Sequence, residues 1–382
     1  MKLLVIGSDR NLFKKDSDIW NRYLDYGKLF KEIHIIVFSH RKLSNKDIKI
    51  GDNVFVYSTD HIFKSFYLWN IYKISKKILK SVPLSVDSHS WVVSSQDPFE
   101  SGLAAWMIKK IYKISLQIQI HTDLFSPYFA KESFMNKLRV LLAKFLLVRA
   151  DGIRVVSERI KNSLITSGYS SNNIAVLPIF VDTEAIKSAP IKIDLHKKYS
   201  QFNFIILMAS RLTKEKNIGL AIEAMAGLAE KYRKIGLVVT GDGPELGSLQ
   251  AKAKELKVAE NVVFVGWTDD LPSLYKTSDL FLLTSNYEGY GRTIIEAMVA
   301  GLPVVTTDVG LAGEVLKNKE SGIVILVGDK KALMAAIENS ILNKEELSHI
   351  GRNAVGVTEN LMIKEQYLEL YRKITESINY GK

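Results

Sequence analysis

A short apolar run, a glycine-containing loop and a helix follow one another between residues 279 and 301, and this unit constrains the fold most strongly. The run 280–284 has the length of a strand, and the residues after Gly291 read as a helix that ends at Gly301. A strand that leads through a glycine loop into a helix N-terminus presents free backbone N–H groups and the positive end of the helix dipole. We therefore predict an anion site in this loop.

Two carboxylates lie eight positions apart in the same unit, Glu288 in the loop and Glu296 within the helix. A carboxylate beside a phosphate would repel it, so we expect each carboxylate to accept hydrogen bonds from neutral hydroxyls instead. Such charge-assisted bonds are roughly twice as strong as neutral ones. A phosphate flanked by hydroxyls describes a nucleotide sugar. The alternative, a solvated loop glutamate and a helix-surface glutamate, is weaker because glycines surround the pair.

Two cations follow another predicted strand, 204–208. Arg211 and Lys216 come after its carboxyl end, where doubly wound sheets bind their ligands. When a sugar–phosphate bond breaks, the diphosphate leaves with added negative charge, and fixed cations stabilise that charge. Solvated loop cations are the alternative. Gly241 begins a tight turn that we expect to line the donor pocket, and Leu246 replaces the third glycine of a dinucleotide fingerprint.

These segments resemble the retaining glycosyltransferases of family 4, which have the GT-B fold. The resemblance rests on E-x7-E within EGYGRTIIEAMVAGLPVV (288–305), on ASRLTKEKNIGLAIEA (209–224), on VVTGDGPE (238–245) and on VVFVGWTDDLPSLYKTSDLFLLTSNYEGYG (262–291). It covers roughly residues 150–380 with high specificity and the first half in outline only.

The resemblance implies a role for each matching residue. Glu288 bonds hydroxyls of the donor sugar, Glu296 holds the nucleotide ribose, and Arg211 with Lys216 binds the diphosphate in place of a divalent metal. No metal site or cofactor is expected. Arg292 departs from the apolar or amide residue usual in the family and faces either phosphate or solvent. The expected donor-binding set is Gly241, Gly289, Tyr290, Gly291, Arg292, Thr293 and Glu296.

In the first half the candidate is His121, directly after the predicted strand 116–120. A lone histidine is more often structural. His121 matches the histidine that the family places in the first domain against the donor sugar, so the resemblance adds it to the catalytic set of Arg211, Lys216 and Glu288. We expect it to hydrogen-bond the sugar rather than to act as an acid or base.

Strands alternate with helices in both halves of the 382-residue chain, which indicates two doubly wound α/β domains with mostly parallel sheets. We expect an acceptor-binding domain at 1–182, a donor-binding domain at 183–362 and, as the resemblance implies, a helix at 363–382 that returns to the first domain. The predicted strands are 2–7, 33–38, 91–94, 116–120, 152–156, 174–177, 204–208, 235–240, 262–265, 280–284, 303–307 and 323–327.

The net charge of +11 lies entirely in residues 1–190, with 28 Lys+Arg against 17 Asp+Glu, whereas residues 191–382 hold 24 of each. Within residues 1–190, one predicted helix gathers four lysines on a single face. This face would bind anionic lipid headgroups, and a solvated face is the alternative. The apolar segment 137–149 fits either a buried helix or one that enters a membrane surface. The lysines that share the face are Lys73, Lys76, Lys77 and Lys80. Aromatic residues nearby are Phe63, Phe66, Trp69 and Tyr72.

The absence of cysteine excludes disulfides and thiolate metal sites and fits a reducing compartment. No signal-peptide pattern is visible, and no run reaches the ~18 apolar residues of a membrane span. We therefore expect a cytoplasmic protein that associates peripherally with the inner face of the membrane.

We predict a metal-independent retaining glycosyltransferase of the hexosyltransferase type. It would use a UDP- or GDP-sugar and a glycan or lipid-linked acceptor in cell-surface polysaccharide or glycoconjugate biosynthesis, with no nucleic acid as partner. Two alternatives stay open, a GT-B nucleotide-sugar epimerase and a catalytically silent sugar-nucleotide-binding subunit. The donor sugar, the acceptor and the oligomeric state do not follow from the sequence.

Overall fold

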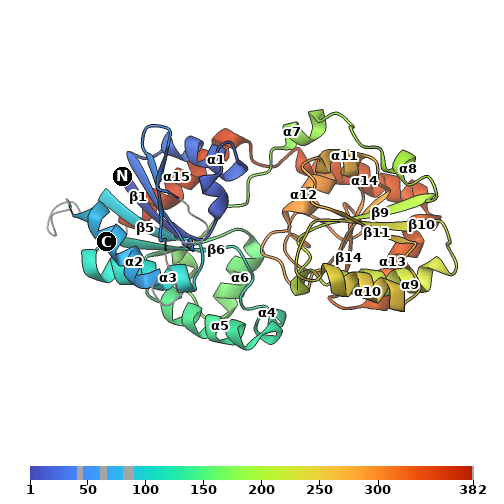
Figure 1. Ribbon diagram of the computed structural model, residues 1–382, viewed down its shortest axis with the longest axis horizontal. Helices are drawn as coiled ribbons and strands as arrows, with labels where there is room; N and C mark the ends of the chain where they lie inside the picture. Colours follow the sequence, from blue (N-terminus) through green and yellow to red (C-terminus); the bar gives the residue numbers. More distant parts are fainter. Residues whose placement is uncertain (41–45, 61–66, 81–89, 381–382) are drawn as a thin grey trace. The chain divides into compact units, whose positions relative to one another are not determined.

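The computed structural model describes residues 1–40, 46–60, 67–80 and 90–380. The chain divides into two compact units, each an α/β domain around one sheet (Figure 1). Unit 1 contains Met1–Phe125, Ser133–Pro178 and Lys364–Lys382, and unit 2 contains Ser126–Glu132 and Ile179–Ile363. The predicted fold class, two α/β domains with parallel sheets, is confirmed.

In its described part, unit 1 contains an eight-stranded sheet in the order β3-β4-β2-β1-β5-β6-β7-β8. Its strands pair in parallel except for the antiparallel β3–β4 pair. The central strands β1, β5 and β6 are buried along almost their whole length, because helices cover both faces of a parallel sheet. The strands are β1 (Lys2–Gly7), β2 (Glu32–Val37), β3 (Ile48–Ile50), β4 (Val54–Ser58), β5 (Trp91–Ser95), β6 (Ser115–Ile120), β7 (Gly152–Val155) and β8 (Ile174–Val176).

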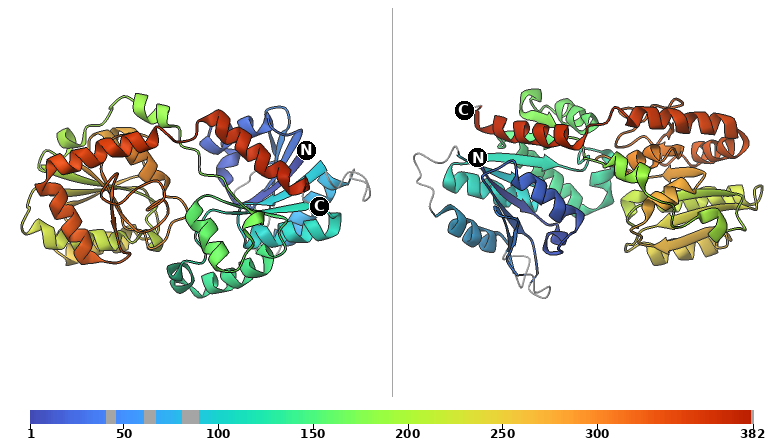
Figure 2. Two further views of the ribbon diagram at one scale, coloured as in Figure 1. Left: turned by 180° about the vertical axis from the view of Figure 1, so that it is seen from behind. Right: turned by 90° about the horizontal axis from the view of Figure 1, so that it is seen from above.

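The C-terminal helix of the chain packs within unit 1, on the face of the sheet opposite α2 and α3 (Figure 2). Its buried Tyr371 contacts the ring of Tyr26 at 4.4 Å between centroids, and the hydroxyls of Tyr26 and Tyr367 lie 2.8 Å apart. The unit 1 helices are α1 (Asp18–Gly27), α2 (Tyr67–Leu79), α3 (Glu100–Tyr112), α5 (Phe134–Leu147), α6 (Glu158–Thr166) and α15 (Lys364–Tyr380).

Unit 2 is built on a six-stranded, wholly parallel sheet in the order β11-β10-β9-β12-β13-β14. The strands are β9 (Phe204–Ala209), β10 (Ile235–Thr240), β11 (Val262–Gly266), β12 (Leu280–Leu283), β13 (Val304–Thr307) and β14 (Ile323–Ile325). The helices are α4 (Pro127–Glu132), α7 (Thr183–Ser188), α8 (Leu195–Lys198), α9 (Ile218–Ala229), α10 (Leu246–Glu255), α11 (Leu271–Lys276), α12 (Arg292–Val299), α13 (Lys330–Leu342) and α14 (Lys344–Thr358).

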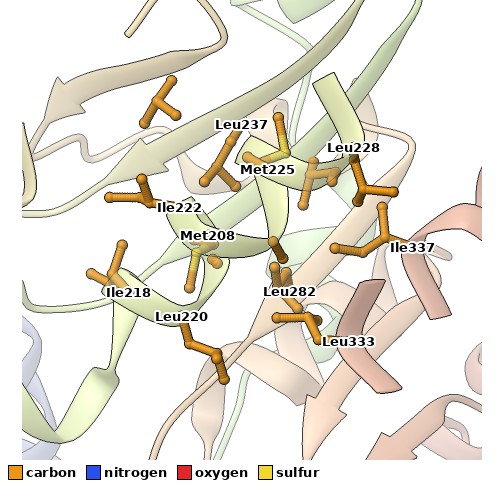
Figure 3. Packing of buried hydrophobic residues seen from close by; sticks show 14 of the residues in the cluster. Met208, Ile218, Leu220, Ile222, Met225, Leu228, Leu237, Leu282, Leu333 and Ile337 are labelled. Atoms are coloured by element: carbon orange, nitrogen blue, oxygen red, sulfur yellow. The ribbon is translucent and has the colours of Figure 1, made fainter. Parts of the chain in front are cut away.

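The core of unit 2 lies on both faces of this sheet. On one face, buried side chains of α9 and α13 interlock with those of β9, β10 and β12 (Figure 3). Met225 and Leu228 of α9 and Ile337 of α13 belong to this cluster. On the other face, Ile294 and Met298 of α12 pack into a second cluster. The helix that carries Glu296 is therefore fixed by its apolar side.

The unit boundaries differ from the expected ones in two places. The division falls after Pro178 rather than after residue 182, and the segment 126–132 joins unit 2 although the chain on both sides of it belongs to unit 1. The segment forms α4, where the ring of Phe129 meets that of Tyr287 edge-on at 5.5 Å. Within the described ranges, no helix combines the length and the apolar character that a membrane crossing requires.

Candidate active site

Except for Gly241, which follows β10, the predicted donor-site residues of unit 2 follow two neighbouring strands, β9 and β12, at the point where the strand order reverses. Hydrogen bonds join the loops after these strands. The N–H of Asn286 donates to the carbonyl of Glu215 at 2.7 Å, and the hydroxyl of Thr284 donates to the carbonyls of Lys216 at 3.1 Å and Asn217 at 3.0 Å. Doubly wound sheets bind ligands at such a switch point. Motifs about 70 residues apart therefore converge where a ligand is expected.

An ion pair between Lys216 and Glu288 joins the two loops. The Nζ of Lys216 lies 2.5 Å from Oε1 of Glu288, and the two side chains are only 14% and 12% exposed. The hydroxyl of Ser285 donates to the same carboxylate oxygen at 2.8 Å. Removing one partner of such a largely desolvated pair leaves an uncompensated charge, so each group holds the other in place. The sequence predicts both residues for the site but not this contact.

Arg211 is an accessible cation of the site. Its side chain is 73% exposed, and its NH2 group lies 3.3 Å from Oε1 of Glu215. The same oxygen accepts a hydrogen bond from the hydroxyl of Thr213 at 2.7 Å. Exposed ion pairs contribute little free energy, and a guanidinium has five N–H donors. Arg211 can therefore turn towards an anionic ligand at small cost.

Glu296 is buried in α12, with 6% of the residue exposed. Its Oε2 accepts a hydrogen bond from the hydroxyl of Tyr275 at 2.9 Å, and its Oε1 lies 2.6 Å from Nε of Arg292. Desolvation, followed by the charge of Glu296, raises the pKa of Tyr275 well above its usual value, so this hydroxyl stays protonated and donates. Arg292 thus pairs with Glu296 while half of its side chain remains exposed.

The glycine turns bring backbone close to backbone around the site. Gly241 has a φ of 128°, and a Cβ there would lie 1.8 Å from the carbonyl oxygen of Ser210. Gly291 has a φ of 90° in the N-cap position of α12. Because the first N–H groups of a helix have no partners within it, α12 directs donors into the loop of the predicted cradle. The other predicted cradle residues lie in the same stretch: Gly289, Tyr290, Arg292 and Thr293.

Several contacts of the site are not evident from the sequence. The hydroxyl of Tyr287 donates to Oε2 of Glu132 in α4 at 2.6 Å, which attaches α4 to the residue before Glu288. Desolvation and this bond raise the pKa of Tyr287 well above its usual value. The hydroxyl of Tyr275 donates a hydrogen bond to Glu296, and the hydroxyl of Ser285 donates one to Glu288. Of these residues, Tyr287 and Ser285 adjoin the motif in the sequence, whereas nothing local marks Tyr275 or Glu132.

His121 belongs to unit 1, whereas the other predicted site residues belong to unit 2. It follows β6, and its Nε2 lies 3.1 Å from Oε1 of Gln119. Desolvation, followed by the positive charges of Arg154 and Arg22, lowers the pKa of His121 to about 3. The residue itself is exposed, so contact with solvent opposes part of this desolvation. Even a much smaller shift leaves the ring neutral at pH 7.

Metal-binding side chains do not gather anywhere in the described ranges. No group of three or more His, Cys, Asp or Glu that could hold an ion occurs there. Whether the reaction needs a metal stays a prediction to be tested.

Known proteins match both halves of the chain. The model described as "Glycosyl transferases group 1" matches residues 194–356, and that described as "Glycosyltransferase Family 4" matches residues 32–185. The capsular polysaccharide biosynthesis glycosyltransferase CapM of Staphylococcus aureus is 25% identical over 334 residues, with 85% of each chain covered. The lipopolysaccharide core biosynthesis mannosyltransferase LpsB of Rhizobium meliloti is 28% identical over 249 residues, which cover 62% of this chain and 68% of LpsB.

Solved structures match the chain in fold as well. HepE of Anabaena, solved in complex with UDP-glucose, superposes with a TM-score of 0.75 at 21% identity, and all of both chains is covered. The fold and the matches define a glycosyltransferase. The chain belongs to family 4 of these enzymes and has the GT-B fold, as the motifs predicted.

Proposed function

We propose that this enzyme moves a sugar from a nucleotide-sugar donor to a hydroxyl of a glycan or lipid-linked acceptor, with retention of configuration and without a divalent metal. The observation that carries the proposal is the Lys216–Glu288 ion pair at the switch point of unit 2, beside the N-terminus of α12. A cation, a carboxylate and a helix N-terminus at one place suit a diphosphate with a hydroxyl-bearing sugar attached.

The residues have distinct roles in this proposal. Glu288 accepts hydrogen bonds from sugar hydroxyls, Glu296 accepts them from the ribose, and Lys216 and Arg211 hold the diphosphate. The backbone at 290–293 holds phosphate oxygens. Because Lys216 already contacts Glu288, one cation would link the sugar-binding carboxylate to the leaving group. His121 of unit 1 contributes a hydrogen bond to the sugar as a neutral imidazole.

The transfer step follows from the leaving group. The bond between the anomeric carbon and the phosphate oxygen breaks, and its electron pair leaves with the nucleoside diphosphate. The acceptor hydroxyl oxygen forms the new bond on the same face, and its proton passes to the departing phosphate oxygen. Lys216 and Arg211 stabilise the charge that develops on the diphosphate. The products are the glycoside, with its configuration retained, and the protonated nucleoside diphosphate.

The relatives support the choice of substrate class. CapM and LpsB are named for capsular polysaccharide and lipopolysaccharide core biosynthesis, and HepE was solved with UDP-glucose. We therefore propose a UDP- or GDP-sugar as donor and an acceptor in cell-surface glycan biosynthesis. The site contains two cations that can take the role of a metal ion, which supports metal-independent transfer. None of these relatives favours an epimerase or a silent subunit.

The basic face of unit 1 supports a cytoplasmic enzyme at the inner membrane surface. All four lysines of the predicted face are exposed on or just after α2, and Nζ of Lys73 lies 5.1 Å above the ring of Trp69. Phe63 and Phe66, which the sequence analysis placed beside this face, lie outside the described residues. We propose that the face attracts anionic lipid headgroups.

A panel of UDP- and GDP-sugars, offered with glycan and lipid-linked acceptors, tests the function. We expect one donor to stabilise the protein against thermal unfolding and to yield nucleoside diphosphate together with a glycoside. NMR of the anomeric proton should show the donor configuration, and EDTA should leave the rate unchanged. An inverted product, or complete loss with EDTA that Mn²⁺ or Mg²⁺ restores, would contradict the proposed mechanism. Isomerised donor without transfer would instead identify the epimerase.

A further inference from the structure

Helix α5 (Phe134–Leu147) carries apolar residues on its outer side, where a surface helix ordinarily carries polar ones. Phe134 is 74% exposed, Leu141 is 63% exposed and Val148, directly after the helix, is 66% exposed. Leu138 and Phe145, at 43% and 40%, lie between them. The spacing of four and three residues places all five within an arc of about 80°. We call these five residues the α5 stripe.

The stripe lies opposite the side of α5 that packs on unit 1. The buried residues of the helix are Asn136, Ala143, Leu146 and Leu147. At about 100° per residue they lie around the other side of the helix from the stripe. The helix is therefore anchored by one apolar side and presents a second apolar side to the solvent. Monomeric proteins rarely expose a contiguous apolar surface of this kind without a partner.

Cations flank the stripe, and no carboxylate occurs within α5. Lys137 and Lys144 are exposed along one edge. On the other edge Arg149 lies over the ring of Phe145, 3.7 Å from its centroid. Apolar side chains with Lys and Arg at their margins suit the boundary between acyl chains and anionic headgroups. A purely apolar protein partner would not explain the cations.

The length of α5 fits this boundary as well. Fourteen helical residues extend for about 21 Å, too short to cross a bilayer but sufficient to lie in its plane. We propose that the α5 stripe inserts into the surface of an anionic phospholipid bilayer and fixes unit 1 to it. In the same unit α3 packs against both α2 and α5 (Figure 1), and in this proposal the basic face of α2 attracts the bilayer from farther away.

The proposal deepens the proposed function, because it makes the acceptor a molecule held in the membrane. For this it rests on the proposed sugar transfer. Vesicle binding is measured without any sugar donor. Failure to bind lipid and failure to transfer sugar can therefore be told apart.

A matched pair of substitutions tests the stripe. Leu141→Gln removes a stripe residue that is 63% exposed, and Leu342→Gln removes a leucine of α13 that is 62% exposed. Vesicles of phosphatidylcholine, with and without phosphatidylglycerol, are sedimented with each protein. We expect the wild type and Leu342→Gln to bind the anionic vesicles. A double variant that combines Leu141→Gln with Phe134→Gln should bind these vesicles about tenfold less tightly than the wild type. Equal binding of all three proteins would overturn the proposal.

A second pair of variants reports insertion directly and does not depend on loss of binding. Leu141→Trp should gain quenching by phosphatidylglycerol with brominated acyl chains, whereas Leu342→Trp should not. Circular dichroism and thermal unfolding establish that each variant is folded. Quenching that is equal in the two variants would show that α5 does not enter the lipid.

The remaining candidate occupant is a second copy of the chain. Sedimentation velocity without lipid separates it from a membrane. A monomer that binds anionic vesicles supports the proposal. A dimer that Leu141→Gln dissociates, and that ignores vesicles, would overturn the proposal and assign the stripe to self-association.

Discussion

Lys216 is the residue at which the donor site is most directly tested. Lys216→Ala should lower kcat by about 10²-fold, because it removes a cation proposed to stabilise the leaving diphosphate and leaves Glu288 without its partner. Steady-state rates of nucleoside diphosphate release measure the effect. Lys214→Ala, an exposed lysine two positions away, is the matched control and should keep its activity. Full activity of both Lys216→Ala and Arg211→Ala would remove the proposed diphosphate site.

His121 leads to a prediction about pH. Its pKa is lowered by desolvation and by Arg154 and Arg22, so the folded protein keeps the ring neutral. Below the ordinary pKa of about 6.5, the histidine binds a proton in the unfolded chain but stays neutral in the folded chain. The free energy of unfolding therefore falls as the pH decreases. His121→Gln should therefore lose less stability than the wild type between about pH 7 and 5. Denaturant titrations at both pH values measure the difference.

The same substitution tests the role of His121 in the reaction. His121→Gln should lower kcat by about tenfold, as expected for a lost hydrogen bond to the substrate, without changing the shape of the pH–rate profile between about pH 5 and 8. A limb of that profile that disappears in the variant would make His121 an acid or a base instead.

The sequence predicts which residues form the site where backbone topology alone brings them together. Glu288 and Lys216 each follow a strand that the apolar pattern reveals, and the switch point makes those strands neighbours. Side-chain partners were not predictable, because they depend on packing between elements distant in the sequence. Tyr275 reaches Glu296 from α11, and no periodicity in the sequence marks that contact.

At the scale of elements, the turn after β10 shows how the backbone shapes the site. Gly241→Ala should lower the stability of unit 2 by about 2 kcal/mol, because the residue has positive φ and a Cβ would collide with the carbonyl of Ser210. For a domain of this size the unfolding midpoint should fall by about 4 °C or more. Gly247→Ala in α10 is the control. A Cβ there meets no atom within 4 Å, so its midpoint should stay or rise slightly.

The strands and helices that were predicted are those with strong apolar patterns. β1 and β10 are buried along almost their whole length, and α9 is buried along most of its length. The elements that were missed are short. β3 and β4 have three and five residues and depend on pairing with each other and with β2. The six residues of α4 belong to unit 2 through contacts with Tyr287, which a local pattern does not encode.

At the scale of the whole molecule, the net charge is distributed unequally between the two halves of the chain. The entire excess of +11 lies in residues 1–190, whereas residues 191–382 are neutral overall. The neutral half contains the proposed donor site, in which cations and carboxylates pair with one another. The basic half contains the faces proposed to meet anionic lipid. The apolar pattern of α5 was compatible with burial or with a membrane surface, and the exposure of its stripe favours the membrane surface.

The basic face of α2 gives the last prediction. Changing Lys73, Lys76, Lys77 and Lys80 together to Gln should weaken binding to anionic vesicles, because each lysine near such a surface contributes on the order of 1 kcal/mol. The loss should be largest at low salt, since salt at physiological strength screens exposed charges beyond ~8 Å. Vesicle sedimentation over a range of salt concentrations measures it.

The control removes the same charge from unit 2, where four exposed lysines lie on or next to α10 and α13: Lys254, Lys257, Lys330 and Lys331. Net charge alone would weaken vesicle binding equally in the two quadruple variants, and a specific α2 face would weaken it only in the first. The α5 stripe should still insert in the α2 variant, because its apolar contact is insensitive to salt. Residual, salt-independent binding is therefore expected when the α2 lysines are gone. If the α2 variant binds anionic vesicles as tightly as the wild type at low salt, the α2 face is solvated and the α5 stripe accounts for the attachment alone.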